Sequence, residues 1–76
     1  MTDFKVEYDN RFYTMFLEDS QVNPETVEVK IIMYNTVYNI YKDLSTNTWK
    51  NHISKFELGE GLLNAIGKTL EGHLNI

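Results

Sequence analysis

The spacing of hydrophobic residues changes once along this chain, and that change constrains the fold more than any other feature. Between residues 4 and 42, apolar and polar residues alternate over several segments, which is the period of strands with one buried face. From residue 62 onward, leucine and isoleucine recur every three or four residues, which is the period of an amphipathic helix. The sequence therefore predicts a series of strands followed by one C-terminal helix.

Turn-forming residues divide the alternating region into strands. Asparagine and aspartate tolerate positive φ, so clusters of such residues favour tight turns. The segment 18–25, which holds the only proline, is predicted to be a polar loop. The predicted turns are Asp9-Asn10, Asn35-Thr36 and Leu44-Ser45-Thr46-Asn47. The predicted strands are 4–8, 11–17, 26–34 and 37–42. If a fifth strand forms, we expect it at residues 48–53, around Trp49.

The helix is predicted to have its body at Gly59–His73. Ser54 and Glu57 have the spacing of a capping box, but the early glycines of this segment weaken a helix that begins there. Gly67 lies within the helix, where glycine costs about 1 kcal/mol relative to alanine. We interpret Gly67 as a packing position that lets the helix approach the sheet closely.

These elements predict one α+β domain over residues 1–76. A chain of 76 residues is too short for two domains, and its 42% hydrophobic content argues against disorder. We expect an antiparallel β-meander of four to five strands with one C-terminal helix packed across one face.

The turns set the register and therefore the two faces of the sheet. A two-residue turn at Asp9-Asn10 pairs Tyr8 with Arg11, and a turn at Asn35-Thr36 pairs Met33 with Tyr38. A three-residue first turn would instead move Phe12 and Phe16 onto the core face, because a slip of one residue flips every side chain. With two-residue turns, the expected core face holds Phe4, Val6, Tyr13, Met15, Leu17, Val29, Ile31, Met33, Tyr38 and Ile40.

Composition excludes several classes of function. The chain has no cysteine, so disulfide scaffolds and cysteine-based zinc sites are excluded, and a cytoplasmic location is favoured. The net charge is −4, and few lysines or arginines are present to neutralise phosphates, so we expect no nucleic-acid partner. No apolar stretch approaches the about 18 residues of a membrane span, and the first residues do not resemble a signal peptide, so we expect no membrane partner.

No catalytic, metal or cofactor residues are expected. The glycine-rich stretch at Gly59–Gly61 suggests a phosphate loop, but the dinucleotide fingerprint needs glycine at position 64, which is asparagine. The two histidines, His52 and His73, are too far apart in sequence to form the His-x-x-x-His pair of a zinc site. The serines are not part of a nucleophile-elbow motif, which a hydrolase of that class would need. We therefore predict that the protein is not an enzyme and has no cofactor.

The second face of the sheet gives the leading hypothesis for function. A single helix covers only one face, so apolar residues on the other face need a partner. We predict a small non-enzymatic protein–protein interaction module whose partner is another protein or, in a homodimer, a second copy of the chain. Its interface residues would be Phe12, Phe16, Ile32, Tyr34, Val37 and Tyr41. The alternative is a small-ligand-binding domain with a pocket between the helix and the sheet near Trp49 and Tyr38.

The assigned faces make Ile31 a central core residue, since it lies in the middle of the most regularly alternating strand. We expect Ile31→Ala to lower the free energy of unfolding by about 2–5 kcal/mol, as truncation of a buried side chain does. Chemical denaturation measures this loss. A midpoint equal to that of the wild type would mean that the two faces are assigned wrongly.

Overall fold

The computed structural model describes residues 2–53 and 57–76, and within these residues it contains five strands and one helix. The strands form one antiparallel sheet in the order β1-β2-β3-β4-β5, followed by the helix, so the predicted α+β meander is confirmed. The elements are β1 (Thr2–Tyr8), β2 (Arg11–Val22), β3 (Thr26–Met33), β4 (Thr36–Asp43), β5 (Thr48–Asn51) and α1 (Glu60–Leu74).

The first hairpin has the predicted two-residue turn. Asp9 and Asn10 have φ values of 54° and 62°, the left-handed conformation at both turn positions that matches the twist of a hairpin. Tyr8 pairs with Arg11, as predicted. The three-residue alternative is therefore wrong, and the predicted assignment of the faces of β1 and β2 is confirmed.

The second hairpin turns one residue earlier than predicted. Tyr34 and Asn35 occupy the left-handed positions, with φ values of 52° and 61°. Met33 consequently pairs with Thr36, and Ile31 pairs with Tyr38. The predicted turn would have placed β-branched Thr36 at positive φ, a conformation that β-branched residues rarely adopt. Moving the turn by one residue shifts the partner of each β3 residue by two positions along β4. Because side chains alternate with a period of two, the same residues stay on each face.

The predicted loop 18–25 is wrong, because β2 continues to Val22. A β-bulge between Leu17 and Asp19 adds one residue to β2, and beyond it the strand pairs with β3 down to Val22 opposite Val27. The bulge shifts the alternation by one residue, and every residue from 18 to 22 is exposed. An exposed strand of polar residues has the same composition as a loop, which explains the error.

The remaining boundaries agree closely with the prediction. The fifth strand is present but ends at Asn51. The helix starts at Glu60 with Gly59 as its N-cap, and Asn75 caps its C-terminus with φ 59°. The capping-box prediction involves Ser54, which lies outside the described residues. Gly59, not a serine side chain, occupies the cap position of α1.

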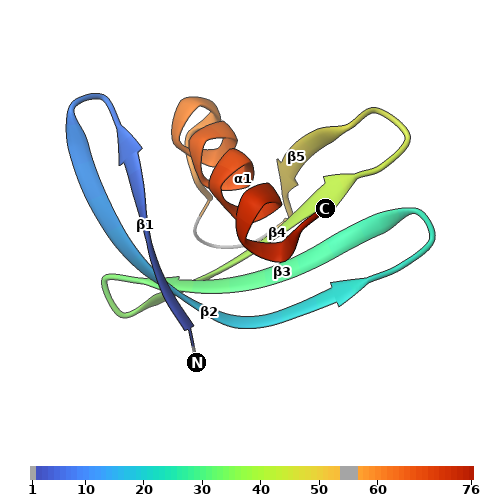
Figure 1. Ribbon diagram of the computed structural model, residues 1–76, viewed down its shortest axis with the longest axis horizontal. Helices are drawn as coiled ribbons and strands as arrows, with labels where there is room; N and C mark the ends of the chain where they lie inside the picture. The colour runs from blue at the N-terminus through green and yellow to red at the C-terminus, as the bar shows by residue number, and fades with distance from the viewer. Residues whose placement is uncertain (1, 54–56) are drawn as a thin grey trace.

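The sheet curls around the helix. Helix α1 contacts both β1 and β5, the two edge strands. In a flat five-stranded sheet these strands would lie about 19 Å apart, nearly twice the diameter of a helix. Figure 1 shows β1 and β5 rising on either side of α1, with β3 and β4 beneath it. The sheet therefore has a concave face filled by the helix and a convex outer face.

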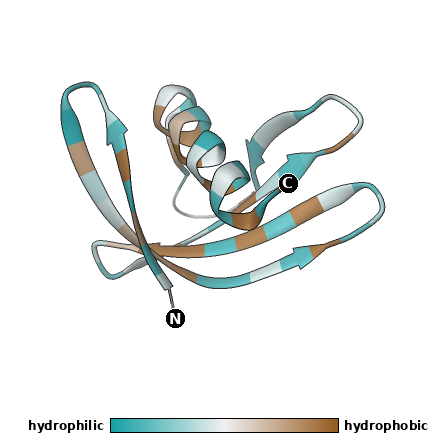
Figure 2. Cartoon of the chain, viewed as in Figure 1, coloured by the Kyte–Doolittle hydropathy of each residue, from teal (hydrophilic) through white to brown (hydrophobic). Residues whose placement is uncertain are grey.

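The core lies between the concave face and the helix. All ten residues predicted for the core face belong to it: seven are buried, and Tyr13, Leu17 and Tyr38 are partly buried against them. Hydrophobic and hydrophilic residues alternate along β3, as Figure 2 shows. The helix contributes Leu63, Ile66, Gly67 and Leu70 as its buried residues.

Two glycines of α1 receive aromatic rings from the two edge strands. An added Cβ at Gly61 would overlap the side chain of Tyr8 in β1, and one at Gly67 would overlap the indole ring of Trp49 in β5. The Trp49 ring is buried, whereas Tyr8 is partly exposed. The expected close approach at Gly67 is therefore confirmed, and its partner is Trp49.

This contact predicts opposite effects of the same substitution at two positions of α1. We expect Gly67→Ala to lower the free energy of unfolding by about 1–3 kcal/mol, because a methyl group there overpacks a buried ring. Gly72 has nothing within 4 Å of an added Cβ. Gly72→Ala is the matched control and should raise stability by up to about 1 kcal/mol through helix propensity. Thermal unfolding of both variants compares them, and a stabilised Gly67→Ala would show that the helix does not lie close to Trp49.

Candidate interaction surface

The convex face carries a row of apolar side chains across three strands. Phe16 of β2 pairs with Ile32 of β3, and Ile32 pairs with Val37 of β4. Directly paired residues of antiparallel strands share a face, and their Cβ atoms lie about 5 Å apart. Ile32 is partly buried between two exposed neighbours, since Phe16 and Val37 are each 42% exposed. We call Phe16, Ile32 and Val37 the convex row.

The other three predicted interface residues lie around the convex row at different distances. Tyr34 is next to it in the β3–β4 turn and is 74% exposed. Phe12 is 69% exposed and lies four residues from Phe16 along β2, about 13 Å away. Tyr41 is partly buried and pairs with Glu28, away from the row. The register therefore places Phe12, Phe16, Ile32, Val37 and Tyr41 on the convex face, with Tyr34 in the turn that follows β3, and only the three residues of the convex row pair directly with one another.

A polar region occupies the convex face beyond the row. His52 Nε2 lies 2.5 Å from Glu28 Oε1, and the His52 ring lies against Tyr41 with 4.5 Å between ring centroids. Partial burial acts to raise the pKa of Glu28, but hydrogen bonds from Thr26 and His52 and the charge of His52 outweigh it, so the pKa lies below its usual value. The region includes a small hollow of about 120 Å³ lined in part by Asp19 and Lys30.

On the concave side, Trp49 belongs to a polar network with the helix. The Trp49 indole N–H donates to Glu71 Oε2 at 2.9 Å, and Lys42 Nζ lies 3.3 Å from the same oxygen. Lys42 is only 6% exposed, so Glu71 supplies the charge that balances a buried ammonium. The hydrogen bond from Trp49 lowers the pKa of Glu71, and the charges of Lys42 and Lys68 add to this against partial desolvation.

Two open hollows flank Trp49 along the β5 edge. One of about 600 Å³ is lined by residues including Trp49, Leu58 and Leu63, and the other, of about 360 Å³, by residues including Trp49, Lys68 and Glu71. Tyr38 lines neither of them. Both hollows are lined by residues of β5 and of α1, so they lie between the helix and the edge of the sheet beside Trp49, but away from Tyr38, the other residue at which the alternative function placed its pocket.

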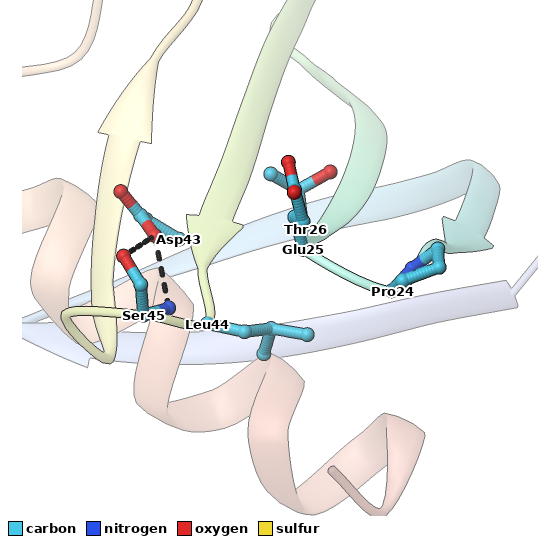
Figure 3. A pocket seen from close by; sticks show the side chains of 6 residues that line it. All are labelled: Pro24, Glu25, Thr26, Asp43, Leu44 and Ser45. Carbon is cyan, nitrogen blue, oxygen red and sulfur yellow. Dashed lines mark hydrogen bonds between the residues drawn. The ribbon is translucent and has the colours of Figure 1, made fainter.

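A further depression of about 540 Å³ lies between the β2–β3 and β4–β5 connections. Figure 3 shows its residues, with Asp43 accepting hydrogen bonds from the backbone N–H and the hydroxyl of Ser45, at 3.0 and 2.7 Å. These bonds, with the charge of Lys50, lower the pKa of Asp43 against slight desolvation. The Asp43 carboxylate is thus occupied in stabilising the β4–β5 turn.

Sequence reasoning missed several polar residues that the fold depends on. The Asn51 side chain donates to Leu58 O at 2.9 Å and accepts from Leu58 N at 3.0 Å, which fixes the chain leading to α1. Lys42 and Glu71 were also missed. Lys42 follows Tyr38 and Ile40 at a spacing of two, so its place on the core face could have been found from the register.

The described residues give no sign of a metal site. Within residues 2–53 and 57–76, no three histidine or carboxylate side chains are grouped so that they could hold an ion.

Among the same residues, α1 is neither long enough nor apolar enough to cross a membrane.

Comparisons with known proteins add no functional information. No protein-family model matches the chain, and neither the curated proteins nor the solved structures contain a significant match.

The network at Glu71 predicts a pH-dependent effect of its substitution. Because the folded-state pKa of Glu71 is below its ordinary value of 4.5, its stabilisation is complete above that value and is lost as pH falls through the folded-state pKa. We expect Glu71→Gln to lower the free energy of unfolding at pH 7 by about 1–3 kcal/mol, because it leaves Lys42 buried without its counter-charge.

The difference between wild type and Glu71→Gln should shrink in acid, as denaturation at several pH values would show. Glu60→Gln, an exposed change of the same kind in the first turn of α1, is the control and should cost less than about 0.5 kcal/mol. A Glu71→Gln effect that stays constant from pH 7 to pH 3 would mean that the charge of Glu71 contributes nothing.

Proposed function

We propose that the protein is a small non-enzymatic protein–protein interaction module and that the convex row, with Tyr34 beside it, is its contact surface. The single observation that carries the proposal is the row itself: Phe16, Ile32 and Val37 lie directly across three adjacent strands on the face that the helix does not cover. Contiguous exposed apolar groups on small proteins usually mark places where another molecule binds.

The composition of this surface supports a protein partner. Aromatic rings are enriched at the centres of protein interfaces because they bury a large area and lose few rotamers. Phe16 and Tyr34 are both well exposed here, and the polar region of the same face supplies Asp19, Glu28 and Lys30 at the border of the row. An apolar centre with a charged border is the usual anatomy of an interface.

The surface is also too open to suit a small molecule. Small-ligand sites are concave and enclose most of the ligand, whereas the outer face of a curled sheet is convex. The hollows beside Trp49 are the better place for a small ligand, but they are open, and Trp49 already uses its N–H on Glu71.

Site-specific photocross-linking in the native cells tests this proposal. A benzophenone amino acid at position 34 should become covalently linked to a protein on irradiation, whether that protein is another copy or a different one. Adding Phe16→Glu should abolish the product, because an unpaired charge would be placed in a desolvated contact.

Position 22 provides the matched control. Val22 is 68% exposed and lies on the same strand as Phe16, but it pairs with buried Val27 and so points to the opposite face. Neither a cross-linker at position 22 nor Val22→Glu should reproduce these effects. Equal yields from positions 34 and 22, or a product that survives Phe16→Glu, would contradict the proposed surface.

A further inference from the structure

We infer that the partner of the convex row is a second copy of this chain, related by a twofold axis that runs parallel to β2 and β3 and passes between Phe16 and Ile32. In this arrangement Asp19 lies against Lys30 of the partner subunit. The inference rests on the proposed function and assigns both the occupant of the surface and the geometry.

The curvature of the sheet limits where such a contact can be centred. Because β1 and β5 both bend toward the helix, they bend away from anything placed against the convex face (Figure 1). Two convex surfaces touch only along their middle. The contact must therefore be centred on the inner strands β2, β3 and β4, of which β2 and β3 carry both the Phe16–Ile32 pair and the charged Asp19–Lys30 pair.

A twofold axis parallel to these strands exchanges β2 with β3. Phe16 of one copy then lies over Ile32 of the partner subunit, and the same contact occurs a second time by symmetry. Each copy supplies one ring and one branched aliphatic side chain at matching positions. The apolar centre is therefore self-complementary without any second protein.

The neighbouring charged pair is self-complementary under the same axis. Asp19 pairs with Lys30 across β2 and β3, on the convex side and next to the Phe16–Ile32 pair. Exchanging the strands places each Asp19 opposite Lys30 of the partner subunit, which gives two interchain ion pairs at the border of the apolar contact. Both residues are exposed, and among the described residues neither takes part in an ion pair within the chain.

The other simple twofold axis does not give this match. A twofold axis perpendicular to the strands, through the same Phe16–Ile32 pair, would place each strand over the same strand of the partner subunit, running in the opposite direction. Lys30 would then face Tyr34 of the partner subunit, and Asp19 would face Thr14 of the partner subunit, with no opposite charges in contact. Charge complementarity therefore selects the axis parallel to the strands.

Charge reversal with mixing tests this geometry. We expect Asp19→Lys and Lys30→Asp each to raise the dimer dissociation constant about tenfold or more in analytical ultracentrifugation, because each homodimer would contain two like-charged contacts. An equimolar mixture of the two variants should form a heterodimer of near wild-type affinity, since both interchain contacts then join opposite charges, one in the native sense and one with its signs exchanged. Glu7→Lys is the matched control, because β1 bends away from the contact.

The outcomes separate the inference from the proposed function. A wild-type chain that stays monomeric at about millimolar concentration overturns the second copy as occupant, and cross-linking at position 34 then decides whether a different protein binds. Suppose that Phe16→Glu dissociates the wild-type dimer, but neither charge variant weakens it or mixing the variants does not restore the affinity. The proposed axis is then wrong, and the proposed surface is left intact. A dimer unaffected by Phe16→Glu contradicts both.

Discussion

The close packing of Trp49 on Gly67 is the contact on which the rest of the structure depends. It joins the last strand of the sheet to the middle of the helix, and the adjacent hydrogen bond from the indole to Glu71 fixes the ring. Tyr8 makes the corresponding contact with Gly61 from the first strand. Because one helix contacts both edge strands, the sheet must curl, and the curl buries the centre of one face.

The same constraint leaves the other face without a cover. The chain has one helix in its described part, and all of that helix's buried residues are directed toward the concave face. The convex row therefore has no helix over it, although Phe16 and Ile32 are apolar at positions where the alternation of their strands would place polar residues. A small domain gains little by exposing such a row, so its presence is best explained by a contact with another molecule.

Sequence reasoning predicted the faces better than the boundaries. The faces depend only on the alternation and on the parity of the turns, so the one-residue error at Tyr34-Asn35 left every core residue correctly placed. The β2 bulge was not predictable, because exposed polar residues after Leu17 fit a strand and a loop equally well. The burial of Lys42 depends on Glu71, which is distant in sequence, and periodicity carries no information about such a pairing.

The convex row connects this fold to its proposed function, and an isotope-filtered NOE experiment tests that connection most directly. In a concentrated equimolar mixture of labelled and unlabelled chains, this experiment detects only NOEs between a proton of a labelled copy and a proton of an unlabelled copy. We expect intermolecular contacts from the Phe16 ring to the Ile32 methyl groups. Intermolecular contacts confined to the edge strands or the helix, in a sample with the mass of a dimer, would contradict a contact through the convex row.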